Sequence, residues 1–163
     1  MIVIVMGVTG SGKTTIGQAL AQKTGAEFAD ADDFHPAANK TKMAAGHPLD
    51  DADRQPWLEA LNAKLLAWFV AETSGILACS ALKAIYRATL QQGIPGGNVH
   101  FVLLDASRQL IVDRLQQRHH EFMNPALLES QIQTLEVPAD ALRVCNDRTP
   151  SLVVDEILAK LQQ

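Results

Sequence analysis

Apolar and polar residues alternate along the chain in blocks that predict strands and helices in turn. Short continuous apolar runs, several of them β-branched, are typical of strands buried on both faces of a sheet. Five such runs occur, of which the second is the weakest: Ile2–Met6, Ala26–Ala29, Gly75–Cys79, Val99–Leu104 and Leu142–Cys145. The pattern therefore predicts five strands separated by helical segments.

Apolar residues at helical spacing fill the intervals between these strands. Ile16 and Leu20 share one face of a helix that we expect to end near Gly25, because glycine suits a helix C-cap. A long helix is predicted from about Asp53, with Pro56 in its first turn, where a missing N–H costs little. Its apolar face contains Trp57, Leu61, Leu65 and Trp68. Further helices are predicted within 36–48 and at about 80–92, 107–118, 124–136 and 151–161.

Strands that alternate with helices predict an α/β fold with a parallel sheet covered on both faces. The chain has 163 residues, which is enough for one domain with a proper core and too few for two. We therefore expect a single domain over 1–163. Ligands of such folds bind beyond the carboxyl ends of the strands, where the polar clusters of this sequence fall.

Composition and charge exclude several classes of function. Apolar residues make up 47% and charged residues 20% of the chain, which is typical of a soluble globular protein. The formal net charge of −4 argues against nucleic-acid binding, which depends on clustered Lys and Arg. No apolar run has the length of a membrane span, and the start MIVIVMG lacks the basic region of a signal peptide. Two cysteines, Cys79 and Cys145, form no disulfide framework, so we expect a cytoplasmic protein with both thiols buried.

A phosphate-binding loop is predicted directly after the first strand. The segment GVTGSGKT at 7–14 matches G-x-x-x-x-G-K-[ST] and stands between a buried strand and a helix, as that motif requires. Its backbone N–H groups and the helix N-terminus suit a phosphate chain. Lys13 is expected to reach the β- and γ-phosphates, and the Thr14 hydroxyl to serve Mg²⁺. The predicted nucleotide contacts are Gly7, Val8, Thr9, Gly10, Ser11, Gly12, Lys13, Thr14 and Thr15.

Among proteins with this loop, a small kinase fits the sequence best. A GTPase requires a guanine-specifying N-K-x-D segment, and CNDR at 145–148 does not match it. Motor and transporter modules are usually larger and carry motifs that are missing here. A kinase needs a carboxylate beside its acceptor and arginines near the phosphates, and the sequence offers candidates for each.

An acidic segment follows the second strand. Alternation along an extended chain would direct Asp30 and Asp32 to the same side, toward the phosphate loop. Asp30 could then hold Mg²⁺ through water, and Asp32 could orient the attacking hydroxyl. Asp105, at the end of a strand, is a rival metal ligand, and Asp33 is expected to cap a helix or lie at the surface. The alternative for the whole segment is a solvated turn.

Two like-charged pairs stand four residues apart, a spacing that mildly destabilises a helix unless an anion lies between the charges. Arg114 and Arg118 precede the polar segment HHEFMNP, which is typical of a lid at about 118–126. Lys83 and Arg87 follow the third strand on the acceptor side. Together with Arg54, whose guanidinium suits a carboxylate, they indicate an anionic acceptor.

Three segments give the chain a family resemblance: MGVTGSGKTT, DADDFHPAANKTKMAAGHPLDDADRQPWL and CSALKAIYR. With them the chain resembles the small gluconokinases, relatives of shikimate kinase, over nearly its whole length. The resemblance implies a three-layer P-loop NTPase sandwich with strand order 2-3-1-4-5, a small lid and often a homodimer. The implied reaction is ATP-dependent phosphorylation of D-gluconate at its 6-hydroxyl.

By similarity, Asp32 and His35 would hold sugar-acid hydroxyls, while Arg54, Lys83 and Arg87 would face the carboxylate. Thr14 and Asp30 would serve Mg²⁺. Arg118, with Arg114, would cover the phosphates, so Lys13, Asp32 and Arg118 form the predicted catalytic set. The alternatives are a kinase of another small hydroxy acid such as shikimate, and a nucleotide-binding module without phosphotransfer.

Overall fold

The computed structural model of the chain describes residues 1–117 and 125–163. Its centre is a five-stranded parallel sheet with the order β2-β3-β1-β4-β5, which confirms the predicted order. The strands are β1 (Ile2–Met6), β2 (Glu27–Asp30), β3 (Gly75–Ala78), β4 (Val99–Asp105) and β5 (Leu142–Cys145). β1 lies in the middle, where Ile2 pairs with Gly75 on one side and with Val99 on the other.

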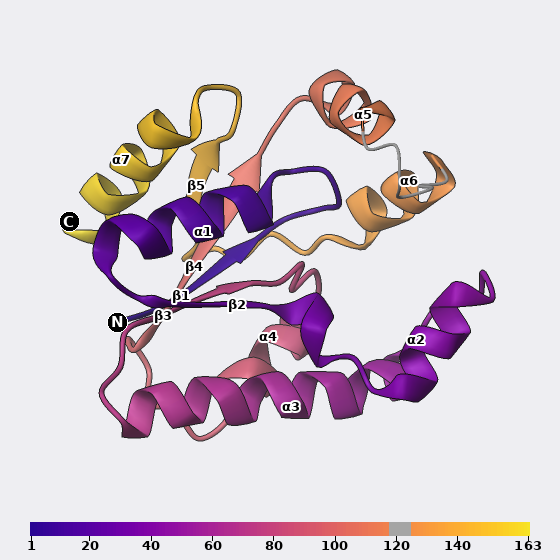
Figure 1. Cartoon of the computed structure of the whole chain (residues 1–163), viewed down its shortest axis with the longest axis horizontal. Helices are drawn as coiled ribbons and strands as arrows, with labels where there is room; N and C mark the ends of the chain where they lie inside the picture. The colour runs from indigo at the N-terminus through magenta and orange to yellow at the C-terminus, as the bar shows by residue number, and fades with distance from the viewer. Residues whose placement is uncertain (118–124) are drawn as a thin grey trace.

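Helices cover both faces of the sheet, as the alternating pattern predicts (Figure 1). They are α1 (Lys13–Thr24), α2 (Ala37–Ala44), α3 (Asp51–Val70), α4 (Ala84–Gln91), α5 (Arg108–Gln116), α6 (Pro125–Thr134) and α7 (Pro150–Leu161), with a 3₁₀ turn η1 (Ala31–Phe34) after β2. Among the described residues, no helix is long and apolar enough to cross a bilayer.

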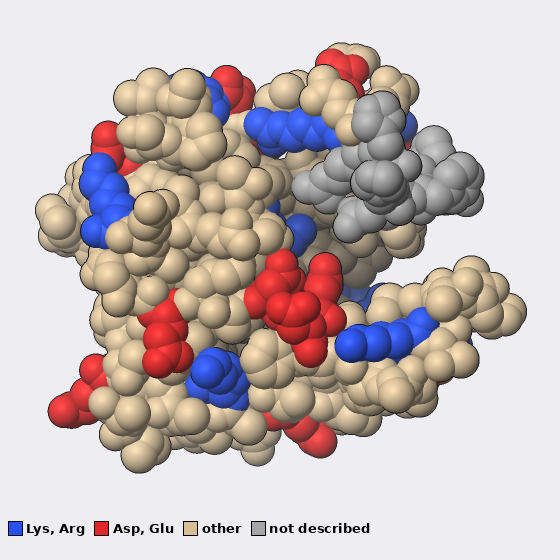
Figure 2. All heavy atoms as spheres, in the orientation of Figure 1, with Lys and Arg blue, Asp and Glu red and all other residues tan. Residues whose placement is uncertain are grey.

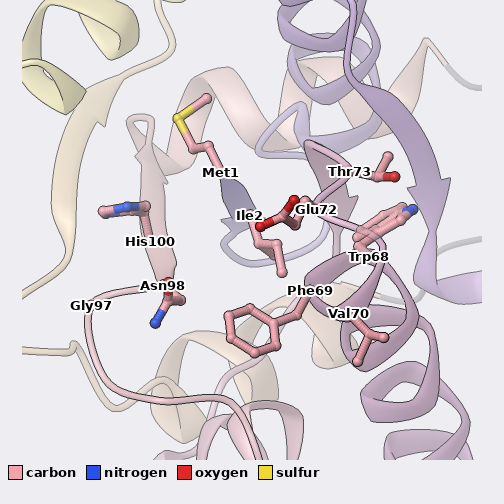
Figure 3. Close-up of a pocket in the computed structure, with 10 residues that line it drawn as sticks. All are labelled: Met1, Ile2, Trp68, Phe69, Val70, Glu72, Thr73, Gly97, Asn98 and His100. Carbon is pink, nitrogen blue, oxygen red and sulfur yellow. The ribbon is translucent and has the colours of Figure 1, made fainter.

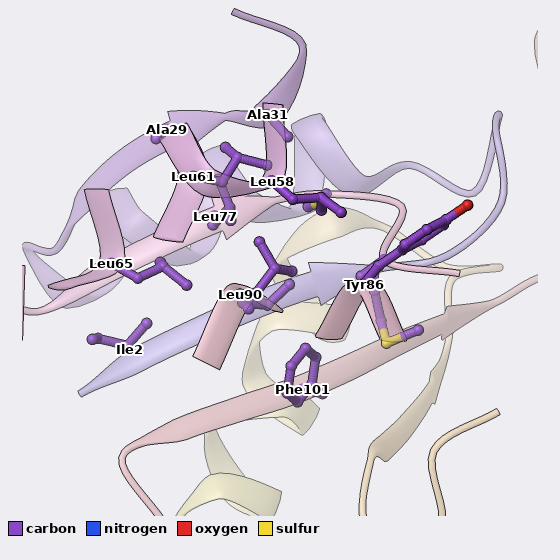
Figure 4. Close-up of a cluster of buried hydrophobic side chains, with 14 of the residues drawn as sticks. Ile2, Ala29, Ala31, Leu58, Leu61, Leu65, Leu77, Tyr86, Leu90 and Phe101 are labelled. Atoms are coloured by element: carbon purple, nitrogen blue, oxygen red, sulfur yellow. The ribbon is translucent and has the colours of Figure 1, made fainter. Parts of the chain in front are cut away.

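The side-chain alternation of β1 divides the core into two layers. Ile2, Ile4 and Met6 point to the face covered by α3 and α4, whereas Val3 and Val5 point to the face covered by α1 and α7. Figure 4 shows the first layer, in which side chains of α3 and α4 pack onto the central strands. Because β1 is buried on both faces, its continuous apolar run was a sufficient signal for a central strand.

Two helices begin at residues other than those predicted, and local hydrogen bonds explain both differences. α3 begins at Asp51 instead of Asp53, because Asp50 and Asp53 form a capping box; Pro56 therefore lies in the second turn. α4 begins at Ala84 instead of Ser80. Residues 79–83, which we call the acceptor loop, are not helical, and Ala81 there has a positive φ of 46°.

The two cysteines differ in their surroundings. Cys79 is buried, and burial raises the pKa of its thiol to about 12. Cys145 is exposed, so the expectation that both thiols are buried is wrong. β5 lies at an edge of the sheet, with Val144 directed into the core and Cys145 away from it, because side chains alternate along a strand.

We expect Gly75→Ala to destabilise the protein, because a Cβ at this position would stand 2.1 Å from a ring carbon of the buried Trp68. Overpacking of this kind costs about 1–3 kcal/mol of unfolding free energy. Gly96→Ala is the matched control, since its Cβ would meet nothing within 4 Å and the change should stay within about 0.5 kcal/mol. Urea unfolding of both variants measures the difference, and equal stabilities would contradict the expectation.

Candidate functional site

The phosphate loop follows a backbone path that requires glycine at two of its turns. Gly10 and Gly12 have φ values of 77° and 95°. A Cβ on Gly12 would stand 2.2 Å from Nδ2 of Asn146, and one on Gly10 would stand 2.9 Å from the Ile111 side chain. The loop is thus packed against α5 and the end of β5. Its path leaves no room for side chains at these two positions.

Polar groups hold the loop from its outer side. Asn146 is buried, and its Nδ2 donates to the carbonyl of Ser11 at 2.8 Å. The Arg114 guanidinium donates to the carbonyls of Gly10 and Ser11, at 3.5 and 3.4 Å, and to that of Asn146. Arg114 therefore supports the loop backbone, and its contact with a nucleotide stays a prediction. Asn146 is a residue that the sequence interpretation missed, although its position directly after a predicted strand was a usable signal.

The loop presents the groups that a phosphate chain and a cation would use. The Oγ of the fully buried Ser11 has no hydrogen-bond partner within the described parts of the chain. Lys13 Nζ donates to the carbonyl of Val8 at 3.1 Å, so the ammonium lies over the loop. Thr14, in the first turn of α1, donates from Oγ1 to Oδ2 of Asp30 at 2.8 Å. The predicted metal ligands Thr14 and Asp30 therefore meet, and they fit a cation held mainly by phosphates and water.

The acidic segment meets the phosphate loop, but not through the extended chain that was predicted. The backbone turns into η1 after Asp30, and Oδ1 of Asp30 accepts from the N–H of Asp32 at 2.9 Å. Strand alternation therefore does not set the direction of Asp32. The charges of Lys13, Asp32 and Asp30 nevertheless all act on the buried Cys79 thiol, which places the three groups around the end of β3. Asp33 is exposed and caps no helix; Asp30 caps η1 instead.

Asp105 is engaged elsewhere, at the β5 edge of the sheet. Its Oδ2 accepts from the Arg143 guanidinium, with distances of 3.0 Å to Nε and 2.9 Å to Nη2. The Asp105 carboxylate is thus already engaged in an ion pair with the neighbouring strand. The structure therefore favours Asp30 over Asp105 as the acid beside the phosphate loop. Within residues 1–117 and 125–163, no group of three or more His, Cys, Asp or Glu residues is arranged to hold a metal ion.

His35 is held against α3 by stacking. Its ring lies on that of Trp57 with a centroid distance of 4.5 Å and an interplanar angle of 11°. Trp57 Nε1 donates to the carbonyl of Ala31 at 2.7 Å, which fixes η1 to α3. Nδ2 of the buried Asn39 lies 3.4 Å from His35 Nδ1 and donates to the carbonyl of Asp53.

The electrostatic surroundings of His35 favour the neutral ring. Burial lowers the pKa of His35; the negative charge of Asp32 opposes this shift, and the charges of Lys40 and Arg54 add to it. A neutral Nδ1 can accept the Asn39 amide hydrogen bond. His35 thus lies within electrostatic range of both Asp32 and Arg54, so the structure brings these three predicted acceptor contacts together.

A cationic cluster adjoins this group where α3 and α4 begin. The Tyr86 hydroxyl donates to Asp51 Oδ1 at 2.5 Å, and Lys83 Nζ lies 3.3 Å from the same oxygen. Arg54 Nη1 donates to the Tyr86 hydroxyl at 3.3 Å, and both cations lie over the Tyr86 ring. The Tyr86 hydroxyl and the Lys83 ammonium hold the pKa of Asp51 below its usual value. Asp51 and Tyr86 were not predicted as site residues; they place Arg54 and Lys83 together.

Arg87 differs from Lys83 in where its charge lies. Its side chain is buried, and its Nη1 donates to the carbonyls of Ala81 at 2.7 Å and Leu82 at 3.2 Å. Burial lowers the pKa of Arg87, against the raising effect of Glu136 and Asp140. Lys83 is the residue before α4, so the pair does not lie along one helix as predicted. Arg87 supports the acceptor loop, and its contact with a substrate stays a prediction.

The assembled groups lie at the carboxyl ends of the strands, where Figure 2 shows acidic side chains beside an indentation between α2 and the part that carries α6. A second hollow, of about 500 Å³, lies at the opposite edge, among Met1, Phe69, Asn98 and His100 (Figure 3). It is remote from the phosphate loop, so we assign the chemistry to the first edge. Arg118 and most of the predicted lid at 118–126 lie outside the described residues.

Comparison with known proteins points to one family. Residues 9–162 match the shikimate kinase family model. A gluconokinase of Gluconobacter oxydans is 42% identical over 98% of this chain and 90% of its own, and the thermosensitive gluconokinase of Escherichia coli is 47% identical over 83% and 71%. The crystal structure of a gluconokinase from Sinorhizobium meliloti superimposes with a TM-score of 0.86 at 38% identity, covering 98% of this chain and 90% of that one.

We expect the stability of the protein to fall as the pH drops below about 6.5, partly through His35. Above this pH the ring is neutral in both states. Because its folded pKa is lowered, the unfolded state takes up the proton first on acidification, which favours unfolding. His35→Phe keeps a ring for Trp57 but cannot titrate, so its unfolding free energy should change less between about pH 7 and pH 5. A native slope in His35→Phe would refute the assignment.

Proposed function

Because this chain belongs to the shikimate kinase family and, within it, to the gluconokinases, we propose that it transfers the γ-phosphoryl group of ATP to the 6-hydroxyl of D-gluconate. The products are 6-phospho-D-gluconate and ADP. The observation that carries this proposal is the similarity to gluconokinases over most of the chain, which favours gluconate over shikimate as the acceptor. The phosphate loop and the acidic segment that meets it support a kinase over a module that only binds nucleotides.

The phosphate loop provides the nucleotide half of the site. In our proposal the loop between Gly7 and Thr15 surrounds the β- and γ-phosphates with its backbone N–H groups, apart from those of Thr9 and Ser11, which donate to Gln131 and Val8. Lys13 moves from the Val8 carbonyl to the phosphate oxygens. Thr14 and Asp30 would hold Mg²⁺, which would neutralise the negative charge of the phosphates when bound. Arg114 keeps the loop in shape. The role of Arg118 at the transferring group is proposed from the family resemblance alone, because this residue lies outside the described ones.

The acceptor half extends from Asp32 to Lys83. Asp32 accepts a hydrogen bond from the 6-hydroxyl and directs its oxygen at the γ-phosphorus, a role that needs no strong base in a loose transition state. The neutral His35 contacts a sugar hydroxyl, and Arg54 and Lys83 bind the carboxylate at the other end. The cationic cluster carries two positive charges and the single negative charge of Asp51, so it retains a net attraction for an anion.

The same reasoning extends to location and assembly. The two thiols are free, and one is exposed, which fits a reducing cytoplasm. We extend the proposal to a homodimer, which is supported by the resemblance to the gluconokinases alone. The small-molecule acceptor and the acidic net charge of −4 agree with a metabolic enzyme that binds no nucleic acid.

A coupled assay that follows ADP release tests the proposed reaction. We expect turnover with D-gluconate, and a kcat/KM for shikimate that is lower by about 100-fold or more, because the polar groups built for one acceptor stay unpaired with another. Removal of divalent cations with EDTA should abolish turnover, and Mg²⁺ should restore it. ADP release with shikimate but not with gluconate would contradict the acceptor assignment.

Two substitutions separate the reacting end of gluconate from its carboxylate end. Asp32→Asn should lower kcat by about 10²–10⁴-fold with little change in the KM for ATP. Lys83→Ala should instead raise the KM for gluconate by roughly tenfold, because it removes a charged hydrogen-bond donor. Lys23→Ala, a lysine that pairs with Asp155 away from the site, is the control. An equal loss of kcat and ATP affinity in Asp32→Asn would remove Asp32 from the acceptor role.

A further inference from the structure

The end of α6 and the residues that follow it contact both halves of the site. Gln131, in the last turn of α6, accepts a hydrogen bond at Oε1 from the backbone N–H of Thr9 at 2.7 Å. Just beyond α6, the Glu136 N–H donates to the carbonyl of Leu82 at 2.8 Å. Its Oε1 accepts from the N–H of Ala84 at 3.2 Å. Figure 1 shows α6 beside the loop between β1 and α1. One short stretch of chain thus connects the phosphate loop to the acceptor loop.

A small hydrophobic cluster reinforces this connection. Val8 of the phosphate loop and Leu82 of the acceptor loop are buried together with Ile111 of α5 and Leu128 of α6, and Leu135 packs against them. Buried side chains are closely packed, so a displacement of one loop also displaces the residues that pack against it. The two loops therefore share a packed interior in addition to the hydrogen bonds at 131 and 136.

The acceptor loop depends on contacts from outside itself. Ala81 adopts a left-handed conformation that is unfavourable for a residue with a Cβ. Lys83, the N-cap of α4, makes no side-chain capping hydrogen bond. Glu136 takes this role from a distance, because its carboxylate accepts the N–H of Ala84 at the positive end of α4. The backbone position of Lys83, and with it the place of its ammonium, therefore depends on Glu136.

From these contacts we propose that Gln131 and Glu136 are positioning residues that hold the phosphate loop and the acceptor loop in a fixed mutual arrangement. ATP binds at the phosphate loop; Gln131 links this loop to the end of α6, and Glu136 links the end of α6 to residues 82–84, so nucleotide binding at the first loop restricts the second. Neither side chain touches the reacting atoms. The inference rests on the proposed function in naming ATP as the ligand of the phosphate loop and gluconate as the ligand of the acceptor loop.

Hydrogen exchange tests the coupling without reference to any acceptor. In the native protein, a non-hydrolysable ATP analogue should slow amide exchange of residues 82–84 by roughly tenfold. Gln131→Ala should abolish this protection, while Gln133→Ala, an exposed glutamine on the same helix, should retain it. The inference is overturned if the native protein shows no such protection, or if Gln131→Ala keeps it.

Steady-state kinetics provide the second readout. Glu136→Ala should raise the KM for gluconate by roughly tenfold, and Glu136→Gln, which keeps an acceptor oxygen for Ala84, should stay within about threefold of the native value. Gln131→Ala should also raise the KM for gluconate, and the double variant should be no worse than Glu136→Ala alone, because both act through one connection. Additive effects, or a failure of Glu136→Gln to restore the KM, would overturn the inference.

The two measurements separate this inference from the proposed function. Nucleotide-dependent protection of residues 82–84 in a protein that does not turn over gluconate would contradict the acceptor assignment and leave the coupling supported. Gluconate turnover without that protection would contradict the coupling alone.

Discussion

The whole site depends on a backbone path that only glycine can follow. At Gly12 the chain turns left-handed, and a Cβ there would stand 2.2 Å from Asn146 Nδ2; a Cβ on Gly10, which is also left-handed, would stand 2.9 Å from the Ile111 side chain of α5. Within the loop, the Ser11 N–H and the Lys13 ammonium donate to the Val8 carbonyl. Asn146 and Arg114 hold the path from outside the loop by donating to its carbonyls. Because Asn146 and Arg114 bind carbonyl oxygens and not N–H groups, the contacts that shape the loop also prepare it to bind phosphates.

The charges along the site suit a molecule that has a neutral hydroxyl at one end and an anionic group at the other. Acidic groups lie near the phosphate loop, where Thr14 meets Asp30, and cations lie at the start of α3 and α4. His35 stands between the two and stays neutral because burial outweighs the pull of Asp32. A charged His35 imidazole would attract the acidic groups near the phosphate loop and repel the cations at the start of α3 and α4. The stacked Trp57 therefore has an electrostatic effect as well as a packing one, since it removes water from the ring.

The sequence predicted those features whose cause is local, and missed those whose cause lies far along the chain. β1 and the phosphate loop were predicted because a doubly buried strand and a glycine-rich turn leave contiguous patterns. The 3₁₀ turn at Asp32 and the late start of α4 were not, because they depend on Trp57 and Glu136. Likewise, spacing suggested a cation pair at Lys83 and Arg87, whereas Arg87 turns inward to the carbonyls of the acceptor loop. Asn146 and Gln131 belong to no motif, and their roles follow from their contacts with the phosphate loop.

The central place of β1 also bears on how the chain folds during synthesis. Ile2 pairs with Gly75 and with Val99, so β1 has no partner strand until β3 has been synthesised, and its other edge stays open until β4 has followed. Until β3 is made, a β-branched, uncharged segment with the composition of an aggregation-prone strand has no partner. The central strand of the folded enzyme is thus also the strand that stays unpaired, and exposed to aggregation, for longest during synthesis.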